Sequence, residues 1–534
     1  MHSSTKSNLL VASCYAGILA LGMAVGPKFG HERGSANMGN YFPLATTSAE
    51  KVDQVLNIIE ENYVDPVKVD TLQNLAINQI LSHLDPHSSY LPPIKAREQS
   101  QSLEGNYTGI GIEYFMLKDT ILVSSVKNGP AAKAGIHAGD RILMVNKRKV
   151  AGTGITPTQI VSLIKGRPGT SLNLLLKPRG DSKNKLVTVK RDKITVSSID
   201  AAYMLTPGVG YIKISKFGAR TDADFASEIG RLQQAEMKSL VLDLRQNGGG
   251  YLSAATALAD EFLPDKQLIV FTKGEHEPRT DYFATAKGKF ETGKLIVLID
   301  ETTASASEVV AGAIQDLDRG VVIGRRSFGK GLVQEQFNFG DGSALNLTIA
   351  RYYTPLGRSI QRPYKMPAEK YFEEVSKRLE DGGETNQDSL QKAGASVKTS
   401  AGRTLYGGGG IMPDITVAID TSSFNAYYYA LRARGIITEF LFRKFADKYH
   451  PSSLKQLINE VNLDDEEYET LNLMAKNSGV SAGPKTIKIA REAINTDLRA
   501  SLARMYFGDE AYFVVQNASD KAIARSLQEL HQPN

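Results

Sequence analysis

Between residues 209 and 324, apolar runs without alternating polar residues recur, and helical patterns separate most of them. The runs have the length of strands; they are GYIKISKF, SLVLDLR, QLIVFT, KLIVLID and VVIG. Strands of this kind are typical of a parallel sheet with helices on both faces, because both sides of each strand are then buried. The region therefore predicts an α/β core built on a buried, mostly parallel sheet.

The rest of the chain divides into parts with different patterns, as expected for 534 residues. Amphipathic helices are predicted over 48–104, and short strands with glycine-rich turns predict a small barrel-like β unit over 105–192. The core then covers 193–420 and includes a polar insertion, read as mobile, at about 365–405. Helical patterns dominate 421–534. The prediction is a multidomain α/β protein.

The N-terminal sequence is typical of an exported protein. Lys6 precedes an apolar run from Leu9 to Val25, which matches the basic and apolar regions of a secretory signal. We expect residues 1–30 to be a signal peptide or a membrane anchor, followed by a linker at 31–47. The protein is then expected in the periplasm, either tethered to the inner membrane or released after signal cleavage.

Composition excludes several other classes of protein. The net charge of +5 is small, and no dense run of Lys and Arg indicates a nucleic-acid partner. Cys14 is the only cysteine, so an intrachain disulfide and a cysteine-ligated zinc site are both excluded. We expect no metal and no organic cofactor.

A candidate nucleophile lies where an apolar strand gives way to a helix, in IVLIDETTASASEVVAGAIQD. Ser305 falls near the first helical turn, where free backbone amides can stabilise an oxyanion. Ser305 and Glu308 also fit a capping box, which is purely structural, and these residues alone favour that interpretation. Nearby hydroxyl groups are rival nucleophiles on spacing alone; they belong to Thr302, Thr303 and Ser307.

A serine nucleophile needs a proton acceptor. None of the eight histidines falls in the predicted sheet or in the motifs at its strand ends, so a Ser-His-Asp triad is unsupported. Lys330, in SFGKGLVQ, is the other candidate, although most lysines are simply solvated. To act as a base it must be neutral, which requires burial to lower its pKa. Gln334 would orient the amine without adding charge.

A third candidate element is LDLRQNGGG, residues 242–250. Glycines directly after a buried strand expose backbone N–H groups. This arrangement suits an oxyanion hole, an anion-binding turn or a simple tight bend. A phosphate-binding loop is not indicated, because no G-K-[ST] follows.

Together these motifs resemble those of the carboxyl-terminal processing peptidases, the tail-specific proteases of the S41 serine peptidase family. The resemblance spans about residues 48–417 and rests on eight motifs in order: LDPHSSYLPP, YTGIGIEY, GPAAKAGIHAGDRIL, LDLRQNGGG, TASASEVVAG, SFGKGLVQ, ARYYTPLGRSIQ and GGIMPDITV. Lys165 departs from the family pattern, since some relatives carry a substrate-sensing arginine there.

The resemblance implies a serine endopeptidase with a Ser-Lys dyad. Ser305 would be the nucleophile, Lys330 the base and Gln334 its orienting partner, with the amides of Gly250 and Ala306 as the oxyanion hole. The β unit would be a PDZ domain that binds accessible C-terminal tails of exported proteins. The loop that receives the tail carboxylate would consist of Gly109, Ile110, Gly111 and Ile112.

Two other functions remain in view. A catalytically inert PDZ scaffold would bind protein C-termini without cleaving them, although the presence of both Ser305 and Lys330 argues against it. An α/β hydrolase of small esters would need a G-x-S-x-G elbow, which the A-S-A sequence at Ser305 lacks. Helical segments on both sides of the core are compatible with a homodimer, and the N-terminal segment with membrane association.

Overall fold

The computed structural model describes residues 51–181, 183–365, 368–380, 396–420, 423–445 and 449–532. The expected leader or anchor and the linker after it lie outside these ranges. The chain divides into two compact units, residues 1–76 and 77–534. The first contains α2 (Lys51–Asn62) and the start of α3 (Val69–Ser82). All the features discussed below belong to the second.

The core contains a six-stranded sheet in the order β10-β11-β12-β15-β16-β21. Its strands are β10 (Ile199–Thr206), β11 (Val209–Ile214), β12 (Ser239–Asp243), β15 (Lys294–Ile299), β16 (Val321–Gly324) and β21 (Ile415–Thr416). The pair β10–β11 is antiparallel and the other pairs are parallel. The prediction of a mostly parallel sheet is confirmed.

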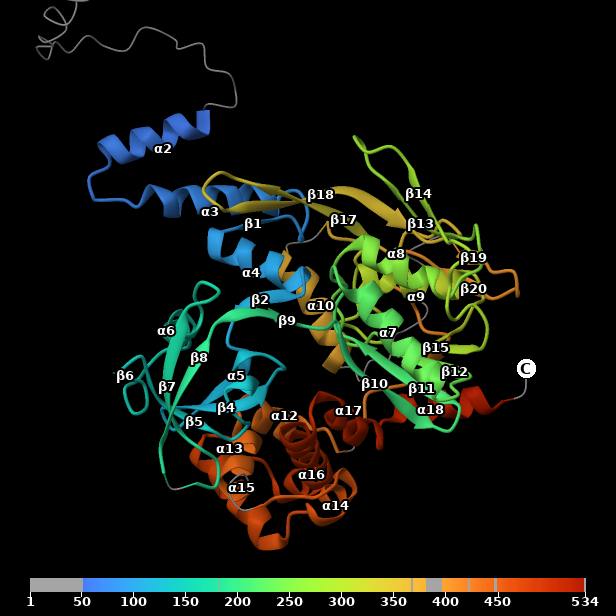
Figure 1. Cartoon of the computed structure of the whole chain (residues 1–534). Helices are drawn as coiled ribbons and strands as arrows, with labels where there is room; N and C mark the ends of the chain where they lie inside the picture. The colour runs from blue at the N-terminus through green and yellow to red at the C-terminus, as the bar shows by residue number, and fades with distance from the viewer. Residues whose placement is uncertain are drawn as a thin grey trace, which may run out of the picture. The chain divides into compact units, whose positions relative to one another are not determined.

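Both faces of this sheet are buried, each in its own apolar cluster. Figure 1 shows α7, α8 and α9 beside the sheet, with α18 at its other side. Ile212, Leu242 and Val297 share one cluster with three helices, α7 (Thr221–Gln234), α8 (Leu252–Asp260) and α9 (Ala306–Asp316). Their neighbours in sequence, such as Tyr211 and Val241, point to the opposite face and pack against α18 (Lys521–His531). Apolar residues are therefore favoured on both faces of the strands, which explains the apolar runs.

One strand expected in the parallel sheet lies elsewhere. The run QLIVFT forms β13 (Leu268–Lys273), which belongs to a separate antiparallel sheet with β1, β14, β17 and β18. These strands are β1 (Ser89–Leu91), β14 (Thr280–Phe283), β17 (Leu332–Asn338) and β18 (Ala344–Tyr353). The prediction for β13 was wrong because a short apolar run shows burial but does not specify its partner strand.

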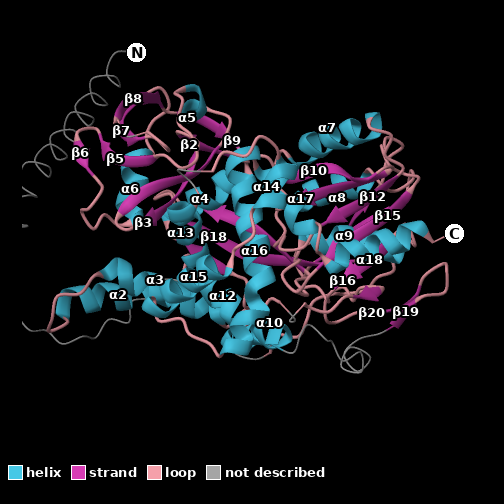
Figure 2. Cartoon of the chain, turned by 90° about the horizontal axis from the view of Figure 1, so that it is seen from below, coloured by secondary structure: helices cyan, strands magenta, loops and turns pink. Residues whose placement is uncertain are grey.

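The predicted β unit has a core of its own. Figure 2 shows its strands gathered with α5 and α6. Its sheet has the order β3-β4-β5-β7-β8, with β6 beside β5, so β3 is an edge strand. The elements are β3 (Ile112–Leu117), β4 (Thr120–Val126), α5 (Pro130–Lys133), β5 (Arg141–Val145), β6 (Arg148–Lys149), α6 (Pro157–Ile164), β7 (Ser171–Lys177) and β8 (Lys185–Lys190). The pair β2 (Asn106–Gly109) and β9 (Asp192–Thr195) flanks it; α4 (Pro93–Leu103) precedes β2.

The C-terminal region is helical, as predicted. A single apolar cluster unites α12 (Ala426–Ala433), α13 (Ile436–Lys444), α14 (Leu454–Glu460), α15 (Asp465–Asn477) and α16 (Pro484–Phe507). The helix α17 (Asp509–Asn517) then leads to α18 on the core sheet. Across the described ranges, no helix combines the length and apolarity that a bilayer span requires.

The insertion expected to be mobile contains regular structure in its described part. Residues 368–380 form α10 (Ala368–Glu380), and a short hairpin follows from β19 (Ser396–Lys398) and β20 (Thr404–Tyr406). Tyr371 of α10 is 1% exposed. The strongly polar composition concealed this helix because most of its residues face solvent and few are buried.

A buried ion pair stabilises the C-terminal end of α9. Removing it tests how much the pair contributes to the free energy of unfolding. Asp316 and Arg358 have side chains 0% and 1% exposed, with Arg358 Nε 2.9 Å from Asp316 Oδ1. We expect Asp316→Ala to lower the free energy of unfolding by about 3–5 kcal/mol, because it leaves a buried guanidinium unpaired.

The control is Asp281→Ala, which removes an exposed pair with Arg279 and should cost about 0–1 kcal/mol. Urea unfolding followed by circular dichroism measures both, since the chain has no tryptophan. If both variants lost the same free energy of unfolding, the buried ion pair would not stabilise α9 more than an exposed pair does.

Candidate active site

Ser305 occupies the N-cap of α9 in a strained backbone conformation. Its φ is +56° and its ψ is −117°, whereas an ordinary N-cap residue is extended. The carbonyl oxygen of Ser305 accepts the N–H groups of Glu308 at 2.8 Å and Val309 at 3.1 Å. These bonds begin the helix through the backbone, and the half-buried side chain lines a cavity of about 620 Å³.

The carboxylate of Glu308 connects Ser305 to the segment that carries Lys330. Its Oε2 accepts the N–H of Ser305 at 2.8 Å and that of Lys330 at 2.9 Å. Its Oε1 accepts the N–H of Gly329 at 2.7 Å and the hydroxyl of Ser327 at 2.5 Å. Burial raises the pKa of Glu308, and these four donors oppose that effect. Since all four groups donate, the geometry fits the ionised carboxylate.

The amine of Lys330 is held by a neutral partner. Its Nζ donates to Oε1 of Gln334 at 2.7 Å, and the amide nitrogen of Gln334 donates to the backbone carbonyl of His87. Burial lowers the pKa of Lys330, while the charges of Asp85 and Glu308 partly restore it. Burial beside a neutral amide therefore favours the unprotonated amine. Ser305 and Lys330 line the same cavity, although no hydrogen bond joins their side chains among the described residues.

The glycines that follow β12 lie against Ser305. A β-carbon on Gly249 would lie 2.8 Å from Ser305 Cβ and 3.0 Å from the nitrogen of Ala306. Gly250 forms a parallel bridge with Phe217, with φ +146°, and a β-carbon there would lie 1.9 Å from Phe217 O. In the described part of the chain, no acceptor bonds the N–H groups of Gly250 and Ala306. Both residues line the cavity.

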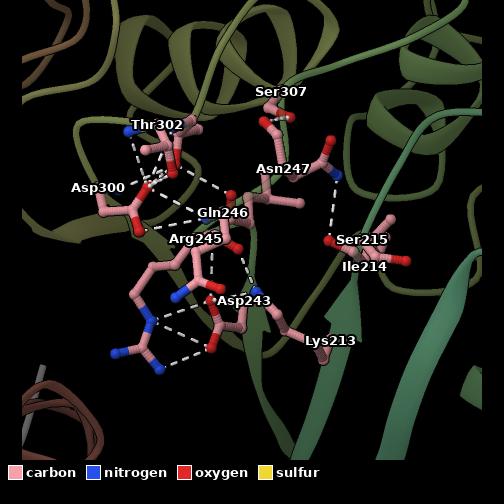
Figure 3. A network of polar contacts seen from close by, with 12 residues as sticks. Lys213, Ile214, Ser215, Asp243, Arg245, Gln246, Asn247, Asp300, Thr302 and Ser307 are labelled. Carbon is pink, nitrogen blue, oxygen red and sulfur yellow. Dashed lines mark hydrogen bonds and ion pairs between the residues drawn. The ribbon is translucent and has the colours of Figure 1, made fainter. Parts of the chain in front are cut away.

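A network of polar contacts fixes this glycine loop to the two neighbouring strand ends (Figure 3). The Asn247 side chain donates to the carbonyl of Ile214 at 3.1 Å, and its backbone carbonyl accepts the hydroxyl of Ser307 at 2.9 Å. The N–H of Gln246 reaches the carboxylate of Asp300 at 3.1 Å. Ser307, a rival nucleophile on spacing, is fully buried and occupied by this bond.

The other rival hydroxyls are also engaged. Thr303 is buried, and its hydroxyl donates to the carbonyl of Leu244 at 2.9 Å. The hydroxyl of Thr302 donates to Asp300 Oδ1 at 2.8 Å. Of the four candidate hydroxyls, the one on Ser305 is the one that lines the cavity with Lys330.

Sequence reasoning missed three aromatic groups beside the site. The buried hydroxyl of Tyr352 lies within hydrogen-bonding distance of the carbonyls of Ser305, at 3.0 Å, and Lys330, and donates to one of them at a time. His87 Nε2 lies 3.0 Å from the hydroxyl of Tyr371. Burial, reinforced by the charge of Lys330, lowers the pKa of His87 to about 3, so this ring is neutral.

Tyr352 lies in the motif ARYYTPLGRSIQ and His87 in LDPHSSYLPP, both of which carry the resemblance. Their positions in these motifs could have identified them from the sequence. His87 does not line the cavity. Its backbone carbonyl, which holds Gln334, is the group that reaches the site. Asp85 fixes this turn by accepting the N–H groups of His87 and Ser88 at 2.7 and 2.8 Å.

The predicted tail-binding loop lies apart from this cavity, at the start of the edge strand β3. The carbonyl of Ile110 accepts the N–H of Ala131 at 2.8 Å, and the carbonyl of Gly111 accepts that of Lys127 at 2.9 Å. Gly111 has φ +82°, a conformation that favours glycine. Lys165, at the end of α6, forms an exposed ion pair with Glu98 at 3.8 Å. No three His, Cys, Asp or Glu side chains converge as a metal site within the described ranges.

Comparisons with known proteins agree with this architecture. Residues 208–368 match the model for peptidase family S41, residues 122–178 that for the PDZ domain, and residues 427–508 a family of unknown function. A carboxy-terminal-processing protease of Bartonella bacilliformis is 39% identical over 292 residues, which are 54% of this chain and 66% of the relative. Carboxy-terminal processing protease CtpB of Bacillus subtilis is 34% identical over 317 residues, 59% of this chain and 65% of the relative.

These alignments span just under two thirds of the length of the curated relatives. Among solved structures, a photosystem II D1 C-terminal processing protease is 29% identical with a TM-score of 0.33, covering 59% of this chain and 91% of that one. The PDZ domain of the carboxy-terminal protease from Vibrio cholerae is 34% identical with a TM-score of 0.16, covering 17% of this chain and 99% of that one.

Replacing Glu308 by Gln tests the connection between Ser305 and Lys330. The amide nitrogen cannot accept, so one pair of donors loses its partner and the two segments move apart. We expect the rate at which a fluorophosphonate labels Ser305 to fall by about tenfold to a hundredfold. Glu335→Gln, the same change at an exposed position next to Gln334, should leave the rate unchanged. A normal labelling rate in Glu308→Gln would refute the connection.

Proposed function

We propose that this chain, whose residues 208–368 match the model for peptidase family S41, is a serine endopeptidase that selects protein substrates by their C-terminal tails. The observation that carries the proposal is the half-buried amine of Lys330, held by the neutral Gln334 beside the cavity that contains Ser305. Such an amine has the lowered pKa that a general base requires.

In this mechanism Lys330 takes the proton of Ser305 as Oγ attacks the scissile carbonyl carbon. The negative oxygen of the tetrahedral intermediate accepts hydrogen bonds from the N–H groups of Gly250 and Ala306. Lys330 then gives the proton to the leaving amine, and an acyl-enzyme remains on Ser305. Water, deprotonated by Lys330, attacks the ester and releases the acyl group. Glu308 holds the backbone of both reacting residues throughout, and Tyr352 donates to the carbonyl of one of them at a time.

The edge strand β3 supports tail recognition by the PDZ domain. An extended substrate tail adds as a strand beside β3, and its terminal carboxylate meets the amides of the Gly109–Ile112 loop. Residues 122–178 match the PDZ family, and β3 has a strand partner on one side only. The N-terminal apolar segment supports export, so the expected substrates are exported proteins.

Substitution of the two reacting side chains tests the chemistry directly. With an unfolded substrate that ends in an apolar tail, Ser305→Ala and Lys330→Ala should each lower kcat by at least about a thousandfold, because nucleophile and base act as a unit. Both variants should still bind the tail. Binding without any turnover by the unmodified protein would instead favour the inert PDZ scaffold. Turnover by Lys330→Ala at the normal rate would show that another group is the base.

The pH dependence of kcat/KM tests the protonation state of Lys330. Since the neutral amine is the active form, kcat/KM should rise with pH through the pKa of Lys330, below the ordinary lysine value of 10.5. The charge of Asp85 raises this pKa, so Asp85→Asn should move the rising limb to lower pH. Asp341→Asn, a change at a distant exposed carboxylate, is the control. A limb that moves to higher pH in Asp85→Asn would contradict the assignment.

Changes to the substrate test the PDZ domain separately. Replacing the apolar tail with a charged one, or amidating its carboxyl group, should raise KM by about tenfold while kcat changes little. Steady-state kinetics on the matched peptides provides both values. An unchanged KM would count against tail recognition and leave the Ser305–Lys330 chemistry unaffected.

A further inference from the structure

A cluster of four charges lies directly behind the glycine loop, and one of them comes from the C-terminal helices. Arg245, in the loop, pairs with Asp243 at 2.7 Å and with Asp520 at 2.7 Å. Lys213 of β11 lies 3.4 Å from Asp243. Figure 3 shows Lys213, Asp243 and Arg245 converging below the loop. Asp520 is the second carboxylate that pairs with Arg245.

Both the side chain and the backbone of Arg245 are held by hydrogen bonds. Its Nε and Nη2 donate to the buried Asp243, at 3.0 and 2.7 Å, and Nη1 donates to Asp520 at 2.7 Å. Its backbone N–H also donates to Asp243 at 2.9 Å, and its carbonyl accepts Lys213 Nζ. The chain then turns through Gln246, a non-glycine residue with φ +60°, before the glycines begin. Arg245 and Gly250 therefore belong to one loop and lie five positions apart.

Asp520 is itself held rigidly. It caps α18, because its Oδ1 accepts the N–H groups of Ala522 at 2.7 Å and Ile523 at 3.1 Å. That helix is anchored on the core sheet by the buried side chains of Ile523 and Leu530. Its other carboxylate oxygen, Oδ2, is the one bonded to Arg245. A single side chain thus connects the start of α18 with the glycine loop.

We propose that Asp520 is a positioning residue for the oxyanion hole, acting through Arg245, so that the C-terminal helices form part of the catalytic apparatus. The inference rests on the proposed function and extends it to a region, after residue 420, whose sequence indicated no chemistry. The charge of Asp520 keeps the guanidinium, and with it the Gly250 amide, where the oxyanion develops.

The test is Asp520→Asn, which removes the charge but keeps a good helix cap, so α18 should stay folded. We expect kcat to fall roughly fivefold to tenfold, which is less than the fall caused by removing an oxyanion donor. KM should stay within about twofold of its value in the unmodified protein. The rate of fluorophosphonate labelling of Ser305 should fall in parallel. Asp520→Glu, which restores the carboxylate, should recover part of the rate.

Asp465→Asn is the matched control, since it removes an exposed ion pair with Arg491 in the same C-terminal region and should change neither rate. A melting temperature for Asp520→Asn close to that of the control shows that folding is intact. Normal kcat and labelling in Asp520→Asn would overturn the inference. A fall that Asp520→Glu does not recover, accompanied by a lower melting temperature, would also overturn it. Failure of the unmodified protein to cleave any tailed substrate would instead refute the proposed function.

Discussion

The carboxylate of Glu308 is the interaction on which the geometry of the candidate site depends. It lies fully inside the protein and accepts four hydrogen bonds, from the backbone of Ser305, Gly329 and Lys330 and the side chain of Ser327. The start of α9 and the segment after β16 are also joined by the N–H of Phe328, which donates to the carbonyl of Thr303 at 2.9 Å, and by the hydroxyl of Tyr352. One buried anion with four donors holds them together, and those bonds offset part of the desolvation that the carboxylate suffers.

The same carboxylate resolves an ambiguity in the sequence. Ser305 and Glu308 have the spacing of a capping box, and in the structure the Glu308 side chain accepts the N–H of Ser305. The N–H of Glu308 donates to the carbonyl of Ser305, and Ser305 also lines the cavity. Structural and catalytic interpretations are therefore compatible, because different atoms of one residue serve each.

Much of the fold was predictable because it depends on local periodicity. The parallel strands and their helices follow from apolar runs. Ser305, Lys330 and Gln334 were candidates from their places beside strand ends, and the resemblance implied their roles. The partner sheet of β13 was not predictable, since burial alone does not specify pairing. Tyr371 and Asp520 were also missed. Each acts through a contact with a residue far away in sequence, and its own surroundings in the chain are ordinary polar helix.

The parallel bridge between Gly250 and Phe217 has a consequence for the gene. A β-carbon at this position would overlap a backbone oxygen, and every amino acid other than glycine has a β-carbon. Every missense change in that codon therefore introduces the same overlap. A series of single-base changes cannot reach another residue at position 250 through a variant that avoids it. Variation in this loop must come from neighbouring codons, so a mutational library is best directed at the exposed Tyr251 and Gln246 on either side.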